Sequence, residues 1–313
     1  MKTVRIGTRG SKLALWQAEW VKAKLLAAHP DLRVELVKIK TSGDMILGIP
    51  LAKIGGKGLF VKEIESALLE GRVDLAVHSM KDVPILIPQG LMLYGVTERE
   101  DPFDVTVSKN DRALNDLPSN ARIGTSSLRR QAQLLHFRSD LEVVSIRGNL
   151  DTRLRKLDEQ NLEAVILASA GLKRMGLSDR VTETIPPEIC LPAIGQGVLA
   201  IETRERDPEV HDLVAFLNDS ETAIAMEAER SFLKRLEGGC QVPIAAYARR
   251  VDGELEIEGM VASVDGKKMV RQSERGKPNE AEALGTRLAE TLLSLGGDEI
   301  LKEIYKQNAP STL

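Results

Sequence analysis

Residues 3–28 read TVRIGTRGSKLALWQAEWVKAKLLAA, and this stretch decides the fold class. Val4 and Ile6 alternate with polar residues, as in a short β-strand. Ser11 is a residue type that caps helix N-termini. Behind it, apolar residues recur at helical spacing and would share one face: Ala14, Ala18, Val21 and Leu25. The pattern predicts a strand, a short turn and an amphipathic helix.

The same unit continues to residue 77. Residues 33–39 alternate as a strand would, and residues 75–77 form a short apolar run typical of a buried strand. Between them lies a second helical stripe that stops at Gly71. Its apolar residues are Phe60, Val61, Ile64, Ala67 and Leu68. This β-α-β-α-β order predicts a mostly parallel sheet with helical crossovers.

A second alternating unit follows the polar crossing at residues 98–102. Its expected strands are residues 122–123, 143–146 and 164–167, with helices starting near Ser127, Asp151 and Leu172. The glycine-rich segment 191–197 then leads into a strand at 198–201. Two α/β domains joined by two crossings, as in periplasmic binding proteins, would form a hinged cleft. Ligands bind such sheets at the carboxyl ends of the strands.

The last ninety or so residues have a different pattern. A helix is expected at 222–236, and hairpin turns are indicated at Asp252-Gly253 and Asp265-Gly266. Two helices close the chain, one of them striped by Leu284, Leu288, Leu292 and Leu295. We expect a small α+β domain with an antiparallel sheet. The predicted domains are 1–98 with 198–217, 99–197, and 218–313.

Composition excludes several classes of protein. The net charge of -3 gives no overall attraction to nucleic acid or anionic membranes. No apolar run reaches membrane-spanning length, and the N-terminus lacks a signal-peptide pattern. The two cysteines cannot form a disulfide framework, which favours the cytoplasm. The four histidines have no ligand spacing, so no metal site is expected.

Residues 122–155 contain seven arginines and no lysine. Guanidinium groups suit carboxylates or phosphates, and the segment GTSSLRR at 124–130 places hydroxyls and backbone N–H groups at a helix start. We therefore favour anion binding over a solvated charged face. Nucleic acid stays open as an alternative, although Phe137 is the only aromatic residue in the stretch.

Three further segments contain reactive residues. Asp82, beside Lys81, follows the buried strand 75–77 and can stay ionised or move a proton, but a surface ion pair is the simpler interpretation. Residues 54–58, IGGKG, suit either a mobile lid or a plain loop. Cys240 follows two glycines, where a thiol can be reached, although a buried apolar role is more common for cysteine. Cys190, between Ile189 and Leu191, fits the buried role.

Taken together, these segments resemble the motifs of the hydroxymethylbilane synthase (porphobilinogen deaminase) family. The matching segments occur in the family's order over nearly the whole chain. They are VHSMKDVP at 77–84, GTSSLRR at 124–130, IRGN at 146–149, TRL at 152–154, EGGCQVP at 237–243, KIGGKGLF at 53–60 and LPAIGQG at 191–197.

The resemblance implies a transferase of haem-type porphyrin biosynthesis. It would join four porphobilinogen molecules head to tail, release ammonia, and free linear hydroxymethylbilane by hydrolysis. The primer would be a dipyrromethane cofactor, bound by a thioether to Cys240. The family is usually monomeric, and neither nucleic acid nor membrane is an expected partner.

The resemblance also implies roles for individual residues. Asp82 matches the catalytic aspartate, which would stabilise the cation left when ammonia departs. Lys57 and Phe60 match the lid and its helix. The implied cofactor-binding residues are Cys240, Ser79, Lys81, Asp82, Thr125, Ser126, Ser127, Arg129, Arg130, Arg147 and Gly148. The implied substrate-binding residues are Arg9, Ser11, Arg147, Arg153, Arg174 and Gln196.

Two rival functions remain at this stage. A two-lobed small-anion binding protein would share the α/β layout but would not need Cys240, and such proteins are normally exported. A nucleic-acid-binding protein would use the arginine-rich stretch and would bind in a salt-sensitive way. The mass of the intact protein separates the first rival from the enzyme, because only the enzyme carries a two-pyrrole adduct.

Overall fold

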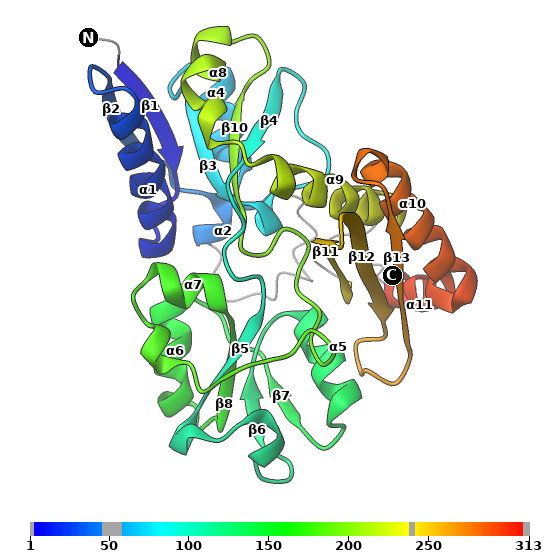
Figure 1. Cartoon of the computed structure of the whole chain (residues 1–313). Coiled ribbons are helices and arrows are strands. Elements are labelled where there is room, and N and C mark those ends of the chain that lie inside the picture. The colour runs from blue at the N-terminus through cyan, green and yellow to red at the C-terminus, as the bar shows by residue number, and fades with distance from the viewer. Residues whose placement is uncertain (1–2, 46–57, 238–241, 309–313) are drawn as a thin grey trace, which may run out of the picture. The chain divides into compact units, whose positions relative to one another are not determined.

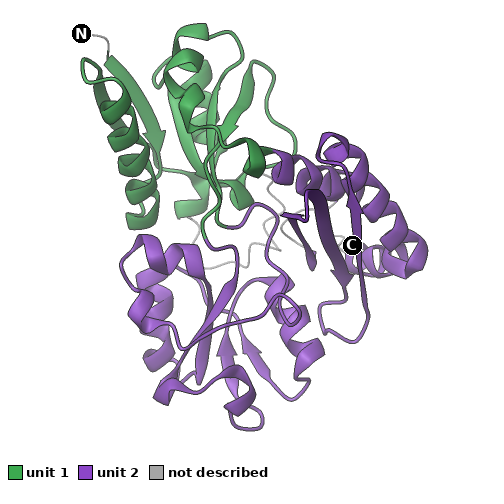
Figure 2. Cartoon of the chain, viewed as in Figure 1, with its two compact units in different colours: residues 1–48, 56–100, 197–223 green, residues 49–55, 101–196, 224–313 purple. Residues whose placement is uncertain are grey.

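The computed structural model describes residues 3–45, 58–237 and 242–308 (Figure 1). Packing divides the chain into two compact units (Figure 2). Unit 1 comprises residues 1–48, 56–100 and 197–223, and unit 2 comprises residues 49–55, 101–196 and 224–313. The division into three domains stays a prediction.

Unit 1 is built on a five-stranded sheet in the order β2-β1-β3-β10-β4. The strands are β1 (Thr3–Thr8), β2 (Arg33–Lys38), β3 (Leu75–Ser79), β4 (Leu91–Val96) and β10 (Leu199–Arg204). The helices are α1 (Lys12–Ala28), α2 (Ser42–Met45), α4 (Lys62–Leu69) and α8 (Pro208–Val214). The predicted cap is confirmed, because the Ser11 side chain accepts a hydrogen bond from the Ala14 N–H.

The sheet of unit 1 is less parallel than the sequence suggests. Strand β1 pairs in parallel with β2 and β3, as expected for helical crossovers. Strand β10 runs antiparallel to both β3 and β4. The reason is connectivity, because β10 enters from residue 197, far along the chain, and not through a helix from its neighbour. The core of this sheet includes Ile6, Val21 and Leu75.

Unit 2 contains a second five-stranded sheet in the order β7-β6-β8-β5-β9. Its strands are β5 (Asp104–Ser108), β6 (Arg122–Gly124), β7 (Glu142–Val144), β8 (Ala164–Ala168) and β9 (Glu183–Thr184). The helices are α5 (Leu128–Phe137), α6 (Leu150–Glu159) and α7 (Ser169–Arg174). Strand β6 is parallel to β7 and β8, whereas β5 is antiparallel to β8 and β9. In both sheets, therefore, three adjacent parallel strands are followed by one strand, β10 or β5, that is antiparallel to its neighbours on both sides.

The predicted boundaries in unit 2 need two corrections. Strand β7 ends at Val144, so Ser145 and Ile146 belong to the turn before α6. Helix α7 begins at Ser169, directly after β8, and not near Leu172. In both places an apolar residue beyond the strand still packs into the core of the sheet. Ile146 does so from the turn after β7, and Leu172 does so from helix α7.

The C-terminal part of unit 2 is an α+β arrangement, as expected. Its antiparallel sheet is β11-β12-β13, with strands β11 (Ile244–Val251), β12 (Glu254–Ala262) and β13 (Met269–Gly276). Its helices are α9 (Ser220–Arg235), which begins in unit 1, α10 (Ala281–Leu292) and α11 (Asp298–Asn308). The stripe of α10 is buried except for Leu295, which is 52% exposed because it follows the helix. The two predicted hairpin turns connect these strands.

The hairpin between β12 and β13 packs against α5. The His136 ring nitrogen Nδ1 lies 2.8 Å from the Gly266 carbonyl oxygen. Gly266 has a φ of 71°, and a Cβ there would lie 2.5 Å from the Ala132 carbonyl oxygen. Only glycine permits this backbone conformation and this close approach. The β12–β13 hairpin and α5 are thereby joined within unit 2.

The centre of unit 2 contains a buried charge network around Asp104, the first residue of β5. Its carboxylate accepts hydrogen bonds from Arg129 and Arg130 of α5, both at 2.7 Å, and from Gln196 at 2.9 Å. Burial raises the pKa of Asp104, but the two guanidinium groups outweigh it and hold that pKa well below its usual range. Asp104 is therefore ionised, and it connects β5, α5 and the 191–197 segment.

We predict that Asp104→Asn destabilises the fold strongly. The amide lacks the charge that compensates two buried guanidinium groups, and breaking such a network costs about 3–5 kcal/mol. Because the folded-state pKa of Asp104 is depressed, its contribution is present above the unfolded-state pKa and is lost as pH falls below it. Urea unfolding of both proteins at pH 7 measures the difference.

Asp140→Asn is the matched control, because this carboxylate pairs with Arg138 at the surface, at 2.6 Å. Solvent screens such a pair, so the loss of stability should be much smaller. If both variants lose the same free energy of unfolding, the burial of Asp104 does not make its charge network more stabilising than a surface ion pair.

Candidate functional site

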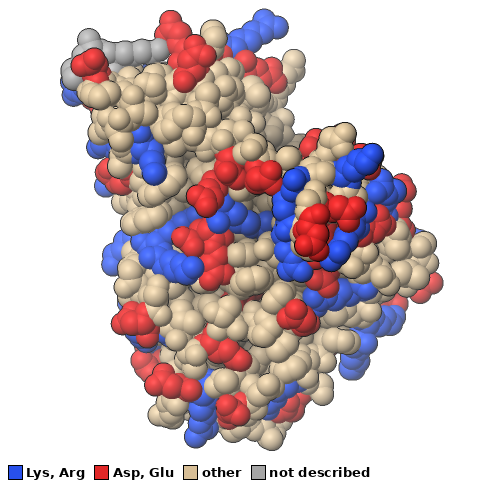
Figure 3. Space-filling view, in the orientation of Figure 1, with Lys and Arg blue, Asp and Glu red and all other residues tan. Residues whose placement is uncertain are grey.

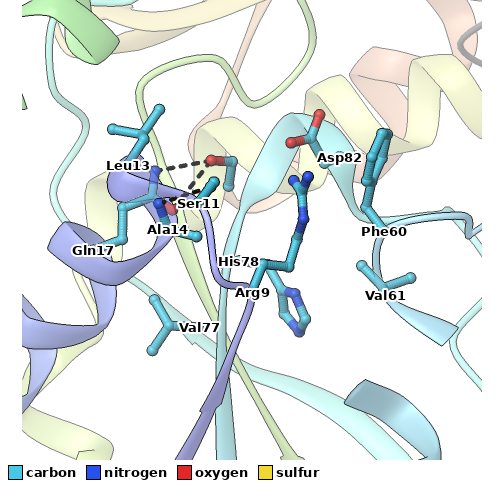
Figure 4. Close-up of a pocket in the computed structure, with 11 residues that line it drawn as sticks. Arg9, Ser11, Leu13, Ala14, Gln17, Phe60, Val61, Val77, His78 and Asp82 are labelled. Carbon is cyan, nitrogen blue, oxygen red and sulfur yellow. Dashed lines mark hydrogen bonds between the residues drawn. The ribbon is translucent and has the colours of Figure 1, made fainter. Parts of the chain in front are cut away.

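Unit 1 has a hollow of about 80 Å³ at the carboxyl ends of its parallel strands (Figure 4). Arg9 and Ser11 follow β1, His78 and Ser79 end β3, and Asp82 lies on the turn beyond β3. The remaining lining residues are Leu13, Ala14, Gln17, Phe60, Val61 and Val77. Such strand ends are where α/β sheets bind ligands, so the hollow is the candidate site of unit 1.

The turn that carries Asp82 is tied to the sheet. Met80 is buried, and its N–H donates to the Val198 carbonyl oxygen at 2.9 Å, which continues the pairing of β3 with β10. The Val83 N–H closes the turn on the Met80 carbonyl at 3.1 Å. Asp82 itself is exposed. A rigid turn thus presents an accessible carboxylate.

Ser79 and Lys81 are both half-buried beside Asp82. The Gln17 amide of α1 donates to the Ser79 hydroxyl at 2.9 Å, so the end of β3 is also attached to α1. Ser11, by contrast, uses its hydroxyl to cap α1. Each of these polar groups is placed by secondary structure that the sequence pattern predicts.

Arg9 is oriented by two neighbours. Its Nη2 lies 2.5 Å from the Asp44 carboxylate of α2, and its guanidinium carbon lies 4.2 Å from the centre of the Phe60 ring. Burial raises the pKa of Asp44, but hydrogen bonds from Arg9 and Thr41 outweigh it, so the net shift is downward. Figure 4 shows the Arg9 side chain extending towards Asp82 and Phe60. The hollow therefore combines a held cation with an exposed carboxylate.

The hydroxyl-rich turn of unit 2 lies between β6 and α5. Ser127 is the N-cap of α5 and accepts from the Arg130 N–H at 3.5 Å. Thr125 is buried, and its hydroxyl accepts from the Ser127 N–H at 3.2 Å, whereas Ser126 is exposed. This is the strand–turn–helix geometry that the sequence predicts for an anion site.

Arg129 and Arg130 are less accessible than an open binding surface would require. Each is about 5–6% exposed and is paired with Asp104, as described above. Arg129 also donates to the Leu191 carbonyl at 2.6 Å, and Arg130 to the Ile166 carbonyl at 2.9 Å. Two guanidinium groups face one carboxylate here, so the cluster keeps an excess of positive charge.

The turn after β7 places further arginines. Gly148 has a φ of 119°, and its carbonyl accepts from Arg153 Nε at 2.9 Å. Arg147 Nη2 is buried without a hydrogen-bond partner among the described residues. Arg174 lies in the last turn of α7 and is half-buried. A buried, unsatisfied guanidinium N–H is costly and suits an anionic ligand.

Two predicted site residues cannot be placed. Cys240 and Lys57 lie outside the described residues. The second cysteine, Cys190, is buried, and burial together with the Asp104 carboxylate raises the pKa of its thiol to about 12. Cys190 is therefore a protonated, unreactive thiol, as its apolar sequence context suggests.

Sequence reasoning missed three groups that organise these sites. Asp104 orients the buried arginines, Asp44 orients Arg9, and Glu202 pairs with His78. For Asp104 and Glu202 the available signal was a charged residue within or beside an apolar strand, in FDVTV at 103–107 and LAIET at 199–203. No comparable signal marks Asp44, which lies in TSGDM at 41–45. Burial of such a residue requires a partner, but the sequence does not say which one.

Metal ligation and membrane insertion find no support in the part of the chain that the structure describes. Within residues 3–45, 58–237 and 242–308, no group of three or more His, Cys, Asp or Glu side chains could hold a metal ion. None of the helices in these ranges is long and apolar enough to cross a membrane. On the face in Figure 3, acidic and basic side chains are interspersed.

The likenesses to solved structures are remote, as two of them illustrate. The alkanesulfonate-binding protein SsuA from Xanthomonas axonopodis pv. citri aligns at 12% identity and a TM-score of 0.38, over 74% of each chain. The probable amino-acid transporter binding protein YtmK from Bacillus subtilis aligns at 12% identity and a TM-score of 0.42, over 69% of this chain and 90% of that one.

Sequence comparison gives much stronger matches. Residues 4–212 match the family model of the porphobilinogen deaminase dipyrromethane cofactor binding domain, and residues 223–294 match that of the C-terminal domain. The porphobilinogen deaminase of Pelobacter propionicus is 58% identical over 98% of both chains. That of Geobacter metallireducens is 57% identical over 98% of this chain and 96% of its own. This chain therefore belongs to the porphobilinogen deaminase family.

Proposed function

We propose that this chain is a hydroxymethylbilane synthase. It joins four porphobilinogen molecules head to tail, releases ammonia at each addition, and frees linear hydroxymethylbilane by hydrolysis. The observation that carries the proposal is the exposed Asp82 on a turn fixed to β3 and β10, in a hollow shared with Arg9. Family membership over nearly the full length supports porphobilinogen as the substrate.

The family uses a dipyrromethane cofactor, and the charges of unit 2 fit such a group. Its pyrroles carry carboxylates, which need cationic partners when they are removed from water. The Arg129 and Arg130 pair has more positive charge than Asp104 neutralises, and Arg147 has a buried N–H without a partner among the described residues. When bound, the cofactor supplies the primer on which the pyrrole chain grows.

Asp82 is the proposed catalytic residue. When porphobilinogen loses ammonia, positive charge develops on the substrate pyrrole, and a carboxylate beside the pyrrole N–H stabilises it. The same carboxylate can accept the proton that leaves when the new bond is complete. Its exposed position on a fixed turn allows contact with substrate without reorganisation of the backbone.

The other predicted residues divide into binding roles. Besides Asp82, the proposed cofactor-binding residues are Cys240, as the covalent anchor, and Ser79, Lys81, Thr125, Ser126, Ser127, Arg129, Arg130, Arg147 and Gly148. The proposed substrate-binding residues are Arg9, Ser11, Arg147, Arg153, Arg174 and Gln196. Lys57 and Phe60 are proposed as parts of a lid. Arg129, Arg130 and Gln196 would act from a buried network and not from an open surface.

We also propose that the protein is a cytoplasmic monomer that binds neither nucleic acid nor membranes. The net charge of -3 gives no overall attraction to nucleic acid, and the face in Figure 3 has interspersed acidic and basic side chains. Mixed surface charge also favours a soluble protein.

The direct test of the function is the mass of the intact protein before and after addition of porphobilinogen. We expect a mass above that of the sequence by a two-pyrrole adduct, and then a ladder of one-pyrrole steps. A protein with the mass of its sequence and no ladder would instead support a small-anion binding protein.

Cys240→Ser should give a protein without the adduct and without deaminase activity, because a hydroxyl does not replace the thioether sulfur. Mass spectrometry and an assay for hydroxymethylbilane measure both effects. Cys190→Ser is the matched control and should keep the adduct, since Cys190 is buried and protonated. Normal turnover by Cys240→Ser would remove Cys240 from the role of anchor.

Asp82→Asn should keep the adduct while turnover falls by about 10²–10⁴-fold, since the amide neither stabilises the cation nor accepts a proton. Asp179→Asn is a suitable control, because Asp179 is also exposed and also lies in a three-residue 3-10 helix. Single-turnover rates of the two variants separate the chemical step from binding. A wild-type rate for Asp82→Asn would refute its catalytic role.

A further inference from the structure

A buried group of ionisable residues lies within unit 1 and has no part in the chemistry proposed above. His78 of β3, Glu202 of β10 and Glu65 of α4 are 5%, 1% and 8% exposed. His78 Nε2 lies 2.8 Å from a Glu202 carboxylate oxygen. Ionisable side chains are rarely buried this deeply without a structural or functional reason.

The pairing of His78 with Glu202 follows from strand register. Strands β3 and β10 are antiparallel neighbours, with Ala200 opposite His78 and Glu202 opposite Ala76. His78 and Glu202 are thus diagonal neighbours on one face of the sheet, within reach of long side chains. Helix α4 packs against both strands, which brings Glu65 to the same face.

The His78–Glu202 pair lies next to the turn that carries Asp82, because His78 belongs to the strand that leads into this turn. His78 is four residues before Asp82, and it lines the same hollow. The β3–β10 pairing that the His78–Glu202 hydrogen bond reinforces continues through Ser79 opposite Leu199 to the Met80 N–H on the Val198 carbonyl. A change in this pairing would therefore move the turn that presents Asp82.

The charges of the group do not balance if every carboxyl ionises. Glu65 and Glu202 would face one imidazole, and one oxygen of Glu202 is already buried without a hydrogen-bond partner in the described residues. Burial is the main cause that raises the pKa of Glu65, to about 7. The charges of Glu202 and, to a smaller extent, Glu63 also raise this pKa, whereas His78 lowers it. The other charged groups nearby already have partners of their own. Glu63 accepts a hydrogen bond from the Ser42 N–H, and Arg5 and Arg204 of the same sheet pair with Asp74. A proton on Glu65 is what removes the excess negative charge.

We propose that the buried His78–Glu202 pair positions the Asp82 turn, and that Glu65, in its protonated form, keeps this pair intact. The proposal rests on the role of Asp82 proposed above. His78 and Glu202 are positioning residues, because neither is assigned a contact with substrate. Glu65 makes the arrangement sensitive to pH, since its ionisation adds a second buried carboxylate beside one imidazole.

The first test compares Glu202→Gln with the wild type and with Glu159→Gln, an exposed helix residue that undergoes the same chemical change. We expect Glu202→Gln to keep the two-pyrrole adduct and a KM within about twofold, while kcat falls at least about tenfold, as for a misplaced catalytic group. Glu159→Gln should match the wild type. A kcat for Glu202→Gln within twofold of the wild type would overturn the positioning role.

The second test uses Glu65→Gln, which keeps the shape of the side chain and cannot ionise. Because the folded-state pKa of Glu65 is raised, the wild type should lose stability as pH rises from about 4.5 to about 7, and the variant should not lose this part. Urea midpoints of the two proteins should therefore diverge with pH over that range and stay separated above it. Parallel midpoints would overturn the role of Glu65.

The two tests stay separable from the proposed function. If the wild type shows neither adduct nor deaminase activity, the proposed function fails, while the divergence of the midpoints still reports on Glu65. If Glu202→Gln does not fold, the pH profile of kcat for Glu65→Gln decides instead. That variant should retain activity to higher pH than the wild type, and an unchanged profile would count against the proposal.

Discussion

Asp104 brings a full negative charge into the interior of unit 2, and several side chains take their orientation from it. Its two carboxylate oxygens accept hydrogen bonds from Arg129, Arg130 and Gln196. The Cys190 thiol sulfur lies 3.3 Å from one of these oxygens. A buried charge is tolerated only when its partners are close and well aligned. The position of α5 against β5 is therefore tightly specified, and so is the segment at 191–197.

In unit 1 a different set of residues holds a proposed catalytic group in place. Its exposed Asp82 needs a rigid support, and that support is the pairing of β3 with β10. The buried His78–Glu202 pair belongs to the same two strands. In both units, therefore, a group proposed for chemistry or binding lies on a turn or at a helix start. A buried hydrogen-bonded contact between ionisable side chains holds it there, between two strands in unit 1 and between sheet and helix in unit 2.

Sequence patterns predicted the regular elements well where the apolar period was clear. The α1 cap at Ser11, the buried stripe of α10 and the antiparallel C-terminal sheet were all predicted. The patterns missed β4, β5 and β9, and they did not reveal that β10 is antiparallel. Strand direction depends on which distant segment pairs with which, and local periodicity contains no information about that. The end of β7 was also misplaced, because Ile146 is apolar yet lies in a turn.

By itself, the sequence determined the α/β class, the family and the identity of the candidate residues, because these depend on local pattern and on motifs that can be read in order. It also indicated that Cys190 is buried. Only the tertiary structure decided that Arg129 and Arg130 are buried against Asp104, and that His78 pairs with Glu202. These contacts join residues that are 25 and 124 positions apart in the sequence. The energy of a buried charge depends on the partners that folding brings to it, and no local stretch of sequence contains both members.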